Sequence, residues 1–338
     1  MKIQNALKKV LDKVDLKEVE MVSIMTQIME GQVKDSQLGS LLTALRIKGE
    51  SIEEIAGAAI VMRDKSENIN VSRAETIVDT CGTGGDGANT FNISTAAAFV
   101  VAGCGLTVAK HGNKAVSSLS GSADVLRCLG VNIDADKLTV EKCLDEIGIG
   151  FLFAPMMHGA MKYAAGVRKE LGFRTIFNLL GPLTNPAGAN AQVVGIYDSS
   201  RLKQIASVLK LLGTRQAFVV NGSDGLDEIT LTGTTNVCEL VNGQVKEYTL
   251  EPENFELTAC KAKDISGGTP EENANIIKNI LSGEQGPKSD IVLMNASAAI
   301  CAGGIAENLK VAMHLARQSI DTSSAEKKLN DLCRLSHQ

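Results

Sequence analysis

The sequence predicts an α/β protein with a small all-helical N-terminal domain, residues 1–72, and a large α/β domain, residues 73–338, built on a mostly parallel central sheet. Two observations predict this. The first 70 residues show helical periodicity and no strand pattern, whereas from Glu75 onward short β-branched runs alternate with helix-like segments. Such alternation is typical of a parallel sheet with helices on both faces. A chain of 338 residues is long enough for two such domains.

Composition excludes several functional classes. With 34 Lys+Arg against 39 Asp+Glu, a net charge of −5 and no Trp, the chain lacks the basic, aromatic surface that nucleic acids require. None of the eight cysteines is spaced as CxxC, so reduced thiols are expected instead of a zinc site or a disulfide framework. Met1–Asp12 has no signal-peptide pattern, and polar residues interrupt the longest uncharged stretch, Ile93–Ala109. We therefore expect a cytoplasmic protein with no membrane partner.

The N-terminal region predicts short amphipathic helices. One helix is expected after Ser36 as its cap, with an apolar face made of Leu38, Leu41, Leu42 and Leu45. Ser51 and Glu54 form a capping box ahead of the helix Ile55–Met62. A later helical segment, 161–180, lies between strands and is expected to return to this helical layer, so that part of 161–185 joins the small domain.

The larger domain is expected to alternate strands with helices. The predicted strands are Thr76–Asp79, Leu106–Ala109, Val131–Ile133, Ile149–Phe153, Ala191–Tyr197, Ala217–Val220 and Val237–Leu240. The predicted helices are Ser94–Gly103, Ser122–Leu129, Leu202–Leu212 and Glu271–Leu281.

A glycine cluster, 79–87, follows the first of these strands. Four glycines in six positions, with acids on both sides, let the backbone approach a ligand and turn its N–H groups toward an anion. Gly82, Gly84 and Gly87 also satisfy GxGxxG, which raises a dinucleotide fold as an alternative. The preceding helical segment, and a second strand that ends in Lys110-His111 instead of an acid, weigh against that alternative. A plain turn is the other alternative.

Two further segments suit phosphate. Residues 89–96 place amide and hydroxyl groups at a helix N-terminus, where N–H groups and the helix dipole favour anions, although simple capping by Asn92 or Ser94 is an alternative. Residues 110–118 follow a strand and carry two lysines, an amide and two hydroxyls around one glycine. This composition favours a polyanion over a plain solvated loop.

The adjacent carboxylates Asp227 and Glu228 follow another strand. Such a pair suits Mg²⁺ that shares its remaining ligands with water and substrate phosphates, although acidic pairs on loops are often only solvated. Arg168 can pair with a substrate carboxylate or can simply lie on a surface helix. Together these segments predict a site for a phosphorylated, Mg²⁺-bound substrate. The lack of GxxxxGK[ST] excludes a P-loop.

The ordered motifs GTGGD (82–86), NIST (92–95), KHGN (110–113) and GLDE (225–228) resemble those of the anthranilate phosphoribosyltransferases, and the similarity extends over nearly the whole chain, including 174–186. The resemblance implies a fold of the nucleoside phosphorylase/phosphoribosyltransferase class III type, an active site at the hinge, and a homodimer. It implies transfer of the phosphoribosyl group of phosphoribosyl pyrophosphate (PRPP) to the amine of anthranilate, in tryptophan synthesis. A pyrimidine nucleoside phosphorylase-like enzyme shares the fold and the KH element but not the full set, and a non-catalytic binding member is a further alternative.

The resemblance also implies site residues. Anthranilate is expected at Gly82, Asn113 and Arg168. The implied PRPP-binding residues are Gly82, Gly85, Asp86, Thr90, Asn92, Ile93, Ser94, Thr95, Lys110, His111, Gly112, Asn113, Lys114, Ala115, Val116, Ser117, Ser118 and Ser122. Two Mg²⁺ ions are implied per site, one on Ser94 and Glu228 and one on Asp227 and Glu228. No general base is named, because the amine of anthranilate is neutral near pH 7 and already nucleophilic.

The chain departs from the family pattern at a few positions. Gly159 and Gly166 stand where proline is frequent, Asn221 replaces a common histidine, and Lys114 replaces an arginine. These differences bear on substrate affinity and hinge stiffness. His158 lies near the substrate segment by the same resemblance, without an assigned contact.

Overall fold

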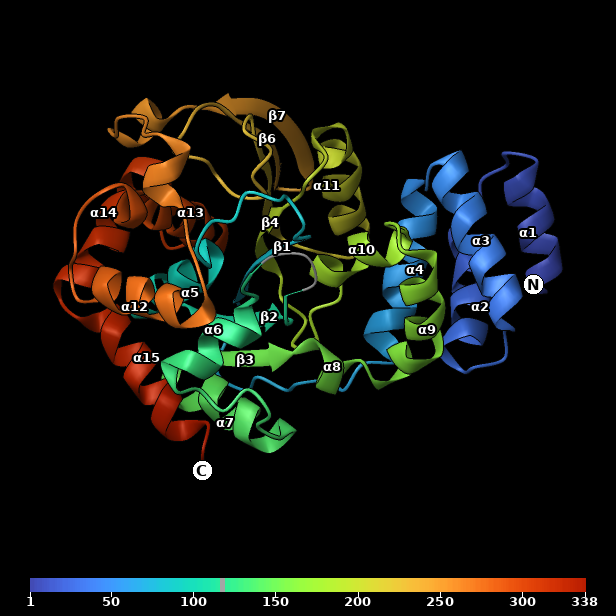
Figure 1. Ribbon diagram of the computed structural model, residues 1–338, viewed down its shortest axis with the longest axis horizontal. Helices are drawn as coiled ribbons and strands as arrows, with labels where there is room; N and C mark the ends of the chain where they lie inside the picture. Colours follow the sequence, from blue (N-terminus) through green and yellow to red (C-terminus); the bar gives the residue numbers. More distant parts are fainter. Residues whose placement is uncertain (116–118) are drawn as a thin grey trace.

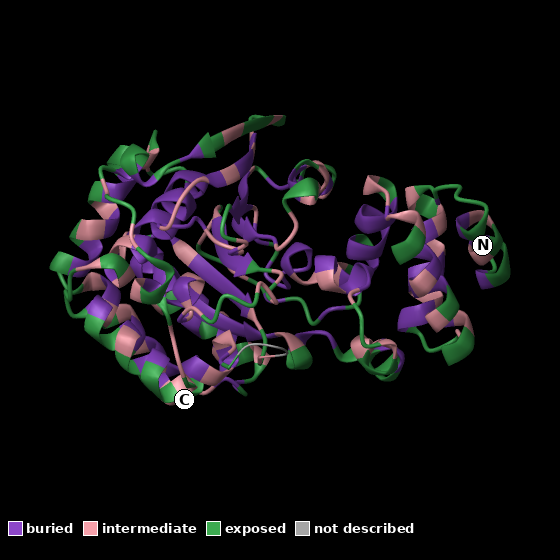
Figure 2. Ribbon diagram, turned by 45° about the horizontal axis from the view of Figure 1, so that its top comes forward, coloured by how far each residue is buried: buried purple, intermediate pink, exposed green. Residues whose placement is uncertain are grey.

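The computed structural model describes residues 1–115 and 119–338, so the expectations for Val116, Ser117 and Ser118 lie outside the described residues. Two lobes are visible: a helical lobe that contains the N-terminus and a larger lobe built around the sheet (Figure 1). Buried residues concentrate in the sheet and on the inward sides of the helices (Figure 2). Among the described residues, no helix is long and apolar enough to cross a membrane.

Four helices begin the chain and form most of the helical lobe. They are α1 (Ile3–Leu11), α2 (Glu18–Met29), α3 (Asp35–Lys48) and α4 (Ile52–Asp64). Helix α1 packs on α3 and α2 packs on α4, and their apolar faces share one core. The capping box predicted at the start of α4 is confirmed: the Glu54 N–H donates to Ser51 Oγ (3.2 Å), and the Ser51 N–H donates to Glu54 Oε2 (2.8 Å).

The larger lobe contains a seven-stranded sheet of order β3-β2-β1-β4-β5-β6-β7. Its strands are β1 (Ile77–Gly82), β2 (Thr107–Gly112), β3 (Ile149–Phe153), β4 (Ala191–Gly195), β5 (Gln216–Gly222), β6 (Thr235–Val241) and β7 (Gln244–Leu250). The pairs from β3 through β5 are parallel, and β6 and β7 extend the sheet antiparallel. The predicted mostly parallel sheet is therefore confirmed.

Helices cover both faces of the sheet. They are α5 (Ile93–Gly103), α6 (Ser122–Leu129), α7 (Lys137–Ile147), α11 (Leu202–Leu211), α12 (Pro270–Leu281), α13 (Pro287–Gly303), α14 (Leu309–Asp321) and α15 (Ser324–Leu335). Short 3₁₀ turns also occur: η1 (Gly159–Met161), η2 (Gly181–Leu183), η3 (Ser199–Arg201), η4 (Pro252–Phe255) and η5 (Ala262–Ile265). Alternate residues of β5 belong to different hydrophobic cores. Phe218 and Val220 share a core with residues of α5 and α13, whereas Ala217 and Val219 share a core with residues of α11 and the N-terminal helices. This is the two-residue period of a strand buried on both faces.

A later part of the chain returns to the helical lobe. After α8 (Ala154–Met157), helix α9 (Lys162–Leu171) packs on α2 and α3, and α10 (Ile176–Leu180) packs on α3 and α4 (Figure 1). The prediction of one helical stretch over 161–180 is wrong in one respect. Gly172, at φ +66°, ends α9 in the left-handed conformation that glycine adopts readily, so the segment is two helices.

Two other sequence predictions are wrong. Helix α3 begins at Asp35 with Lys34 in the capping position, so Ser36 lies inside the first turn, and the Gln37 side chain accepts the Lys34 N–H (3.4 Å). Residues 131–133 are not a strand. The Asn132 N–H donates to Ser336 Oγ (3.0 Å). This main-chain donor therefore finds its hydrogen-bond partner near the C-terminus and not on a neighbouring strand.

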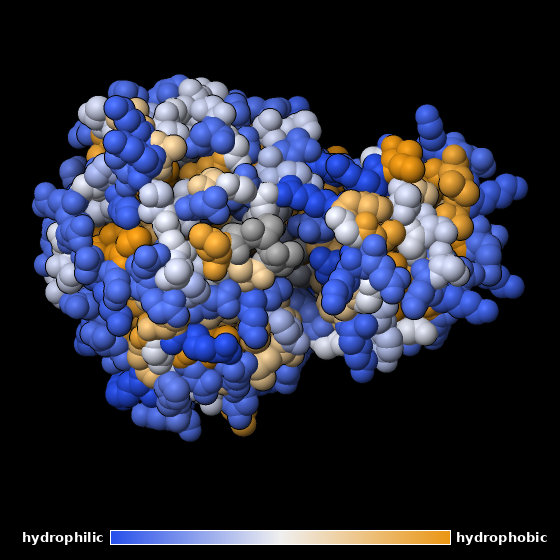
Figure 3. Space-filling model, in the orientation of Figure 1, coloured by the Kyte–Doolittle hydropathy of each residue, from blue (hydrophilic) through white to orange (hydrophobic). Residues whose placement is uncertain are grey.

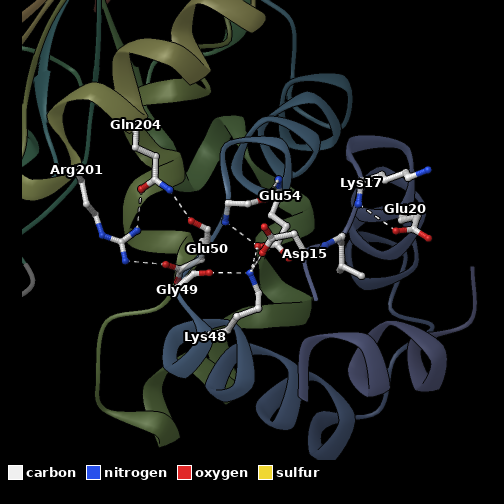
Figure 4. Close-up of polar contacts among 11 residues, drawn as sticks. Asp15, Lys17, Glu20, Lys48, Gly49, Glu50, Glu54, Arg201 and Gln204 are labelled. Carbon is white, nitrogen blue, oxygen red and sulfur yellow. Dashed lines mark hydrogen bonds and ion pairs between the residues drawn. The ribbon is translucent and has the colours of Figure 1, made fainter. Parts of the chain in front are cut away.

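A buried polar network joins the two lobes at the α3–α4 corner (Figure 4). Lys48 forms an ion pair with the fully buried Glu54 (2.9 Å), whose other oxygen accepts the Leu16 N–H (2.9 Å). Glu50, next in the same corner, pairs with Arg201 of η3 (2.8 Å) across the lobes. Each buried charge here therefore has a partner, as burial requires.

We predict that Glu54→Ala strongly destabilises the protein, because it leaves the Leu16 and Ser51 N–H groups without their acceptor and removes the buried carboxylate that pairs with Lys48. The expected loss is about 3 kcal/mol of unfolding free energy, measured from the midpoint of urea denaturation. Glu53→Ala, one residue away and exposed, is the matched control. Equal midpoints for the two variants would contradict this account.

Candidate active site

The site lies where the parallel strands end. Gly82 of β1 pairs in register with Gly195 of β4, and Gly112 of β2 pairs with Phe153 of β3. The loops that follow these strands therefore emerge at one edge of the sheet, which is where ligands bind in open α/β folds. Hydrophilic residues lie on both sides of the indentation between the lobes (Figure 3).

The glycine loop after β1 closes against the loop that follows β5. The Gly84 N–H donates to Asp227 Oδ2 (2.7 Å). Gly84, Gly85 and Gly87 have φ of +65°, +75° and +73°, a conformation that residues with a Cβ rarely adopt. A Cβ on Gly82 would collide with the same Asp227 carboxylate. Close approach and positive φ together explain the glycines that the sequence places here.

The start of α5 receives the second carboxylate. The Ser94 N–H donates to Glu228 Oε1 (3.1 Å), and the Ser94 carbonyl accepts the Thr80 hydroxyl (2.9 Å). Beneath them Lys110 is buried, with its ammonium on the Thr80 carbonyl and 3.4 Å from Ser94 Oγ. The structure thus brings together Ser94, Lys110 and Glu228, three residues that the resemblance implied.

Electrostatics at this edge favour a cation. Burial, and then the Asp227 charge, raise the pKa of Glu228 to about 8. Burial, and then the Asp86 charge, raise the pKa of Asp227 to about 6. Burial lowers the pKa of Lys110, although the surrounding carboxylates oppose this effect. A divalent cation between the carboxylates would stabilise their ionised forms.

The donor set fits Mg²⁺ that is shared with a substrate. Among the described residues, no three His, Cys, Asp or Glu side chains converge as a metal-binding group. Mg²⁺ needs only one or two protein carboxylates when water and phosphate oxygens complete its shell. Asp227 and Glu228 supply that number of carboxylates.

Sequence reasoning missed two residues that hold the ends of β1 and β2 together. Asp79 is fully buried, and its carboxylate accepts the His111 N–H (3.2 Å) and the Asn185 side-chain amide (2.8 Å). Asn185 also donates to the Ala109 carbonyl (2.8 Å). Both residues lie in segments that the sequence had already indicated, because Asp79 is the first residue of the glycine cluster and Asn185 lies within the stretch 174–186.

His111 faces His158 instead of presenting a charge to a ligand. Their Nε2 atoms are 3.2 Å apart and both rings are buried. Burial lowers the pKa of His111 to about 3 and that of His158 to about 4, so both are neutral at pH 7. The accessible positive charge of this loop is therefore Lys114, whose ammonium lies 5.8 Å from the centre of the Phe153 ring.

Asn113 and Ala115, in the loop after β2, form hydrogen bonds with side chains of α6. Ser122 Oγ accepts the Asn113 N–H and donates to its carbonyl, both at 3.2 Å. The Ala115 N–H donates to Asp124 (2.9 Å). A Cβ on Gly112 would collide with Ser122 Oγ, so glycine is required there as well.

The side-chain amide of Asn92 forms hydrogen bonds within the protein through both its nitrogen and its oxygen. It donates to the Ser120 carbonyl (3.1 Å) and accepts from Asn273 of α12 (3.2 Å). Thr90 forms an isolated bridge with Ser266. Asn273 was not anticipated from the sequence, because 181 residues separate it from Asn92.

Ile93 and Thr95 are buried at the start of α5. Their N–H groups donate to the Phe91 (2.7 Å) and Asn92 (3.1 Å) carbonyls. The Thr95 hydroxyl has no hydrogen-bond partner among the described residues. Of the hydroxyls expected at this helix start, that of Ser94 lies 3.4 Å from the Lys110 ammonium.

One arginine lies on α9 and another in the turn between α9 and α10. The Arg168 guanidinium lies 5.2 Å from the centre of the Phe177 ring, and burial lowers its pKa. Arg174 instead reaches the glycine loop, where it donates to the Gly85 carbonyl, and it stacks on Tyr197. Sequence reasoning singled out only Arg168 of this pair.

Comparisons with known proteins agree with this geometry. A family model described as the glycosyl transferase family α/β domain matches residues 74–326, and one for its helical bundle domain matches 4–66. The anthranilate phosphoribosyltransferase of Anaeromyxobacter dehalogenans is 54% identical over 330 residues, covering 98% of this chain and 97% of that protein. This chain belongs to the anthranilate phosphoribosyltransferase family.

Solved structures of anthranilate phosphoribosyltransferases share the fold. That of Thermus thermophilus matches with a TM-score of 0.94 and 41% identity, covering 98% of this chain and 99% of the other. That of Saccharomyces cerevisiae, in complex with PRPP and Mg, matches with a TM-score of 0.90 and 32% identity, covering 99% and 98%. The yeast protein has also been solved with 4-fluoroanthranilate. These relatives support the transferase expectation over the nucleoside phosphorylase alternative.

The raised pKa of Glu228 predicts a pH-dependent stability in the absence of divalent cations. The folded protein keeps this proton up to about pH 8, whereas the unfolded chain loses it near the ordinary value of 4.5. The folded state therefore binds more protons between these values, and its stability falls as pH rises across this window. Glu228→Gln removes this fall, so the unfolding free energy of wild type relative to the variant should decrease from pH 5 to pH 8. A constant difference would contradict the assigned pKa.

Proposed function

We propose that this protein transfers the phosphoribosyl group of PRPP to the amine of anthranilate, giving N-(5-phosphoribosyl)anthranilate and pyrophosphate, the second step of tryptophan synthesis from chorismate. In this reaction the C1–oxygen bond to pyrophosphate breaks, a C1–nitrogen bond forms, and the amine releases a proton. The observation that carries the proposal is the partly buried carboxylate pair Asp227 and Glu228, held against the glycine loop and the start of α5. The PRPP and Mg complex of the yeast relative supports it.

PRPP is proposed to lie along the ends of β1 and β2. The glycine loop, with Gly82, Gly85 and Asp86, brings main-chain groups close to the ligand, and Ser94 adds a hydroxyl. Lys114 supplies positive charge, while Asn92 and Ser122 keep the surrounding loops in place. The other residues of the implied PRPP set remain part of the proposal.

Mg²⁺ is proposed at two positions, one on Ser94 and Glu228 and one on Asp227 and Glu228. When bound, Mg²⁺ neutralises charge on the leaving pyrophosphate. The protein's part is to hold both carboxylates in fixed directions, through the N–H groups of Gly84 and Ser94.

Anthranilate is proposed to bind at Gly82, Asn113 and Arg168. Arg168 is partly buried, and its guanidinium is available for the substrate carboxylate. The site needs no tuned base, since the amine is already nucleophilic, and His111 and His158 are neutral. Orientation of the amine toward C1 then supplies much of the rate.

The proposal extends to the form of the protein. It includes a helical domain of residues 1–72 joined by part of 161–185, a catalytic domain of residues 73–338, a homodimer, and a cytoplasmic location. Packing of α9 and α10 on the N-terminal helices supports the division. The eight free cysteines agree with a reducing compartment.

The direct test follows the fluorescence of anthranilate over time with purified protein, PRPP and Mg²⁺. Loss of signal only in the complete mixture would support the transfer and its metal dependence together. An unchanged signal from folded protein would reject anthranilate as the acceptor.

Removing both carboxylates should abolish Mg²⁺-dependent turnover. Asp227→Ala with Glu228→Ala is expected to lower kcat/KM by at least about 1000-fold, because both carboxylates proposed to bind the metal are removed. The control Asp134→Ala with Glu253→Ala removes two exposed carboxylates and should match wild type. Near-normal turnover in the first variant would mean that the metal lies elsewhere.

Arg168→Ala should act mainly on anthranilate. We expect its apparent KM to rise by about tenfold or more, as loss of a charge-assisted hydrogen bond does, with a much smaller change in the KM for PRPP. Lys169→Ala, the exposed neighbour on α9, should leave both constants unchanged. Equal increases in both KM values would discredit the assignment of Arg168.

A further inference from the structure

One side chain links the α9–α10 turn to the glycine loop. Arg174 donates a hydrogen bond to the Gly85 carbonyl, and its guanidinium lies 3.5 Å from the centre of the Tyr197 ring. A charged donor on a main-chain carbonyl, combined with stacking of the planar guanidinium on an aromatic ring, is a geometry that arginine provides and lysine does not. Arg174 thus contacts the loop proposed to bind PRPP from a segment that lies outside it.

The Gly85 carbonyl is a position where such a contact changes the loop. The peptide between Gly85 and Asp86 is planar and trans, so its carbonyl and its N–H point in opposite directions. By holding the carbonyl, Arg174 directs the Asp86 N–H away from itself. Glycines on this loop, at Gly84, Gly85 and Gly87, permit other peptide orientations at little steric cost. A hydrogen bond from outside the loop is therefore needed to select one peptide orientation.

The ring under Arg174 belongs to the same loop system. The Tyr197 N–H donates to Thr83 Oγ1 (3.2 Å), and the Thr83 N–H donates to the Gly195 carbonyl (2.9 Å). Tyr197 is therefore tied to the glycine loop from the β4 side, while Arg174 approaches it from the helical lobe.

The turn that carries Arg174 also fixes the other arginine of the site. Arg168 lies on α9, over Phe177 of α10, so the two arginines and the ring form one short segment folded at Gly172. A change in this segment alters the position of Arg168 and the hold on Gly85 together.

We propose that Arg174 is a positioning residue that sets the peptide orientation of the glycine loop from the segment that carries Arg168, and so couples the PRPP side of the site to the anthranilate side. The inference rests on the proposed function for its kinetic consequence, but not for its structural one.

Hydrogen–deuterium exchange of the substrate-free protein tests the structural part. Arg174→Ala and Tyr197→Ala should each raise the exchange rate of amides in residues 82–88 by roughly tenfold, because the loop opens more often. Tyr197→Phe keeps the ring and should retain the wild-type rate. Arg215→Ala is the matched control: Arg215 also donates to main-chain carbonyls, those of Ala302 and Gly303, both at 3.2 Å. Unchanged exchange over 82–88 in Arg174→Ala would overturn the proposal.

Steady-state kinetics test the coupling. Arg174→Ala should raise the KM for PRPP by about tenfold, as expected for loss of one charge-assisted hydrogen bond, and should also raise the KM for anthranilate. Arg174→Lys should recover only part of this loss, and Arg215→Ala should leave both constants unchanged. Wild-type KM values in Arg174→Ala would overturn the coupling. A wild-type protein without transferase activity would overturn the proposed function alone, and the exchange experiment would still decide on Arg174.

Discussion

The rest of the site depends on one arrangement, in which two main-chain N–H groups hold two partly buried carboxylates. The Gly84 N–H binds Asp227, and the Ser94 N–H binds Glu228. These contacts join the loop after β5 to the loop after β1, across 143 and 134 residues of chain. Burial makes the ionised carboxylates costly, and the same burial makes them strong ligands for a cation. Without a cation, the ionised carboxylates that would bind it therefore lower the stability of the folded protein, and a bound cation removes this cost.

The parts of the fold that sequence predicted best are those set by local chemistry. The Ser51–Glu54 capping box and the alternation of strands and helices need only neighbouring residues to define them. The glycine loop was also predictable, because positive φ restricts the residue type. Candidate residues on each loop were found in this way, and the resemblance to the family joined them into one site.

Predictions that failed depended on distant partners. Val131–Ile133 has the β-branched composition of a strand, yet the Asn132 N–H within it donates to Ser336 instead of to a neighbouring strand. Asp79, Asn185 and Asn273 were missed as parts of the site, since their contacts become visible only when separate strands and helices are assembled. His111 illustrates the same limit, because its neutrality follows from burial beside His158 and not from its motif. Sequence identified which loops matter but not which side chains face each other.

The return of α9 and α10 to the helical lobe has a consequence for how the protein is made. The core of that lobe includes Ala164, Val167, Ile176 and Phe177 together with residues of the first four helices. On a ribosome, the last of the N-terminal helices ends at Asp64, long before α9 begins at Lys162. Until α9 and α10 have been synthesised, and α11 after them, the apolar faces of the N-terminal helices stay partly uncovered. Strands β1, β2 and β3 are synthesised before α9. The helical lobe, although first in the chain, therefore cannot complete its core before the first strands of the larger lobe have been synthesised.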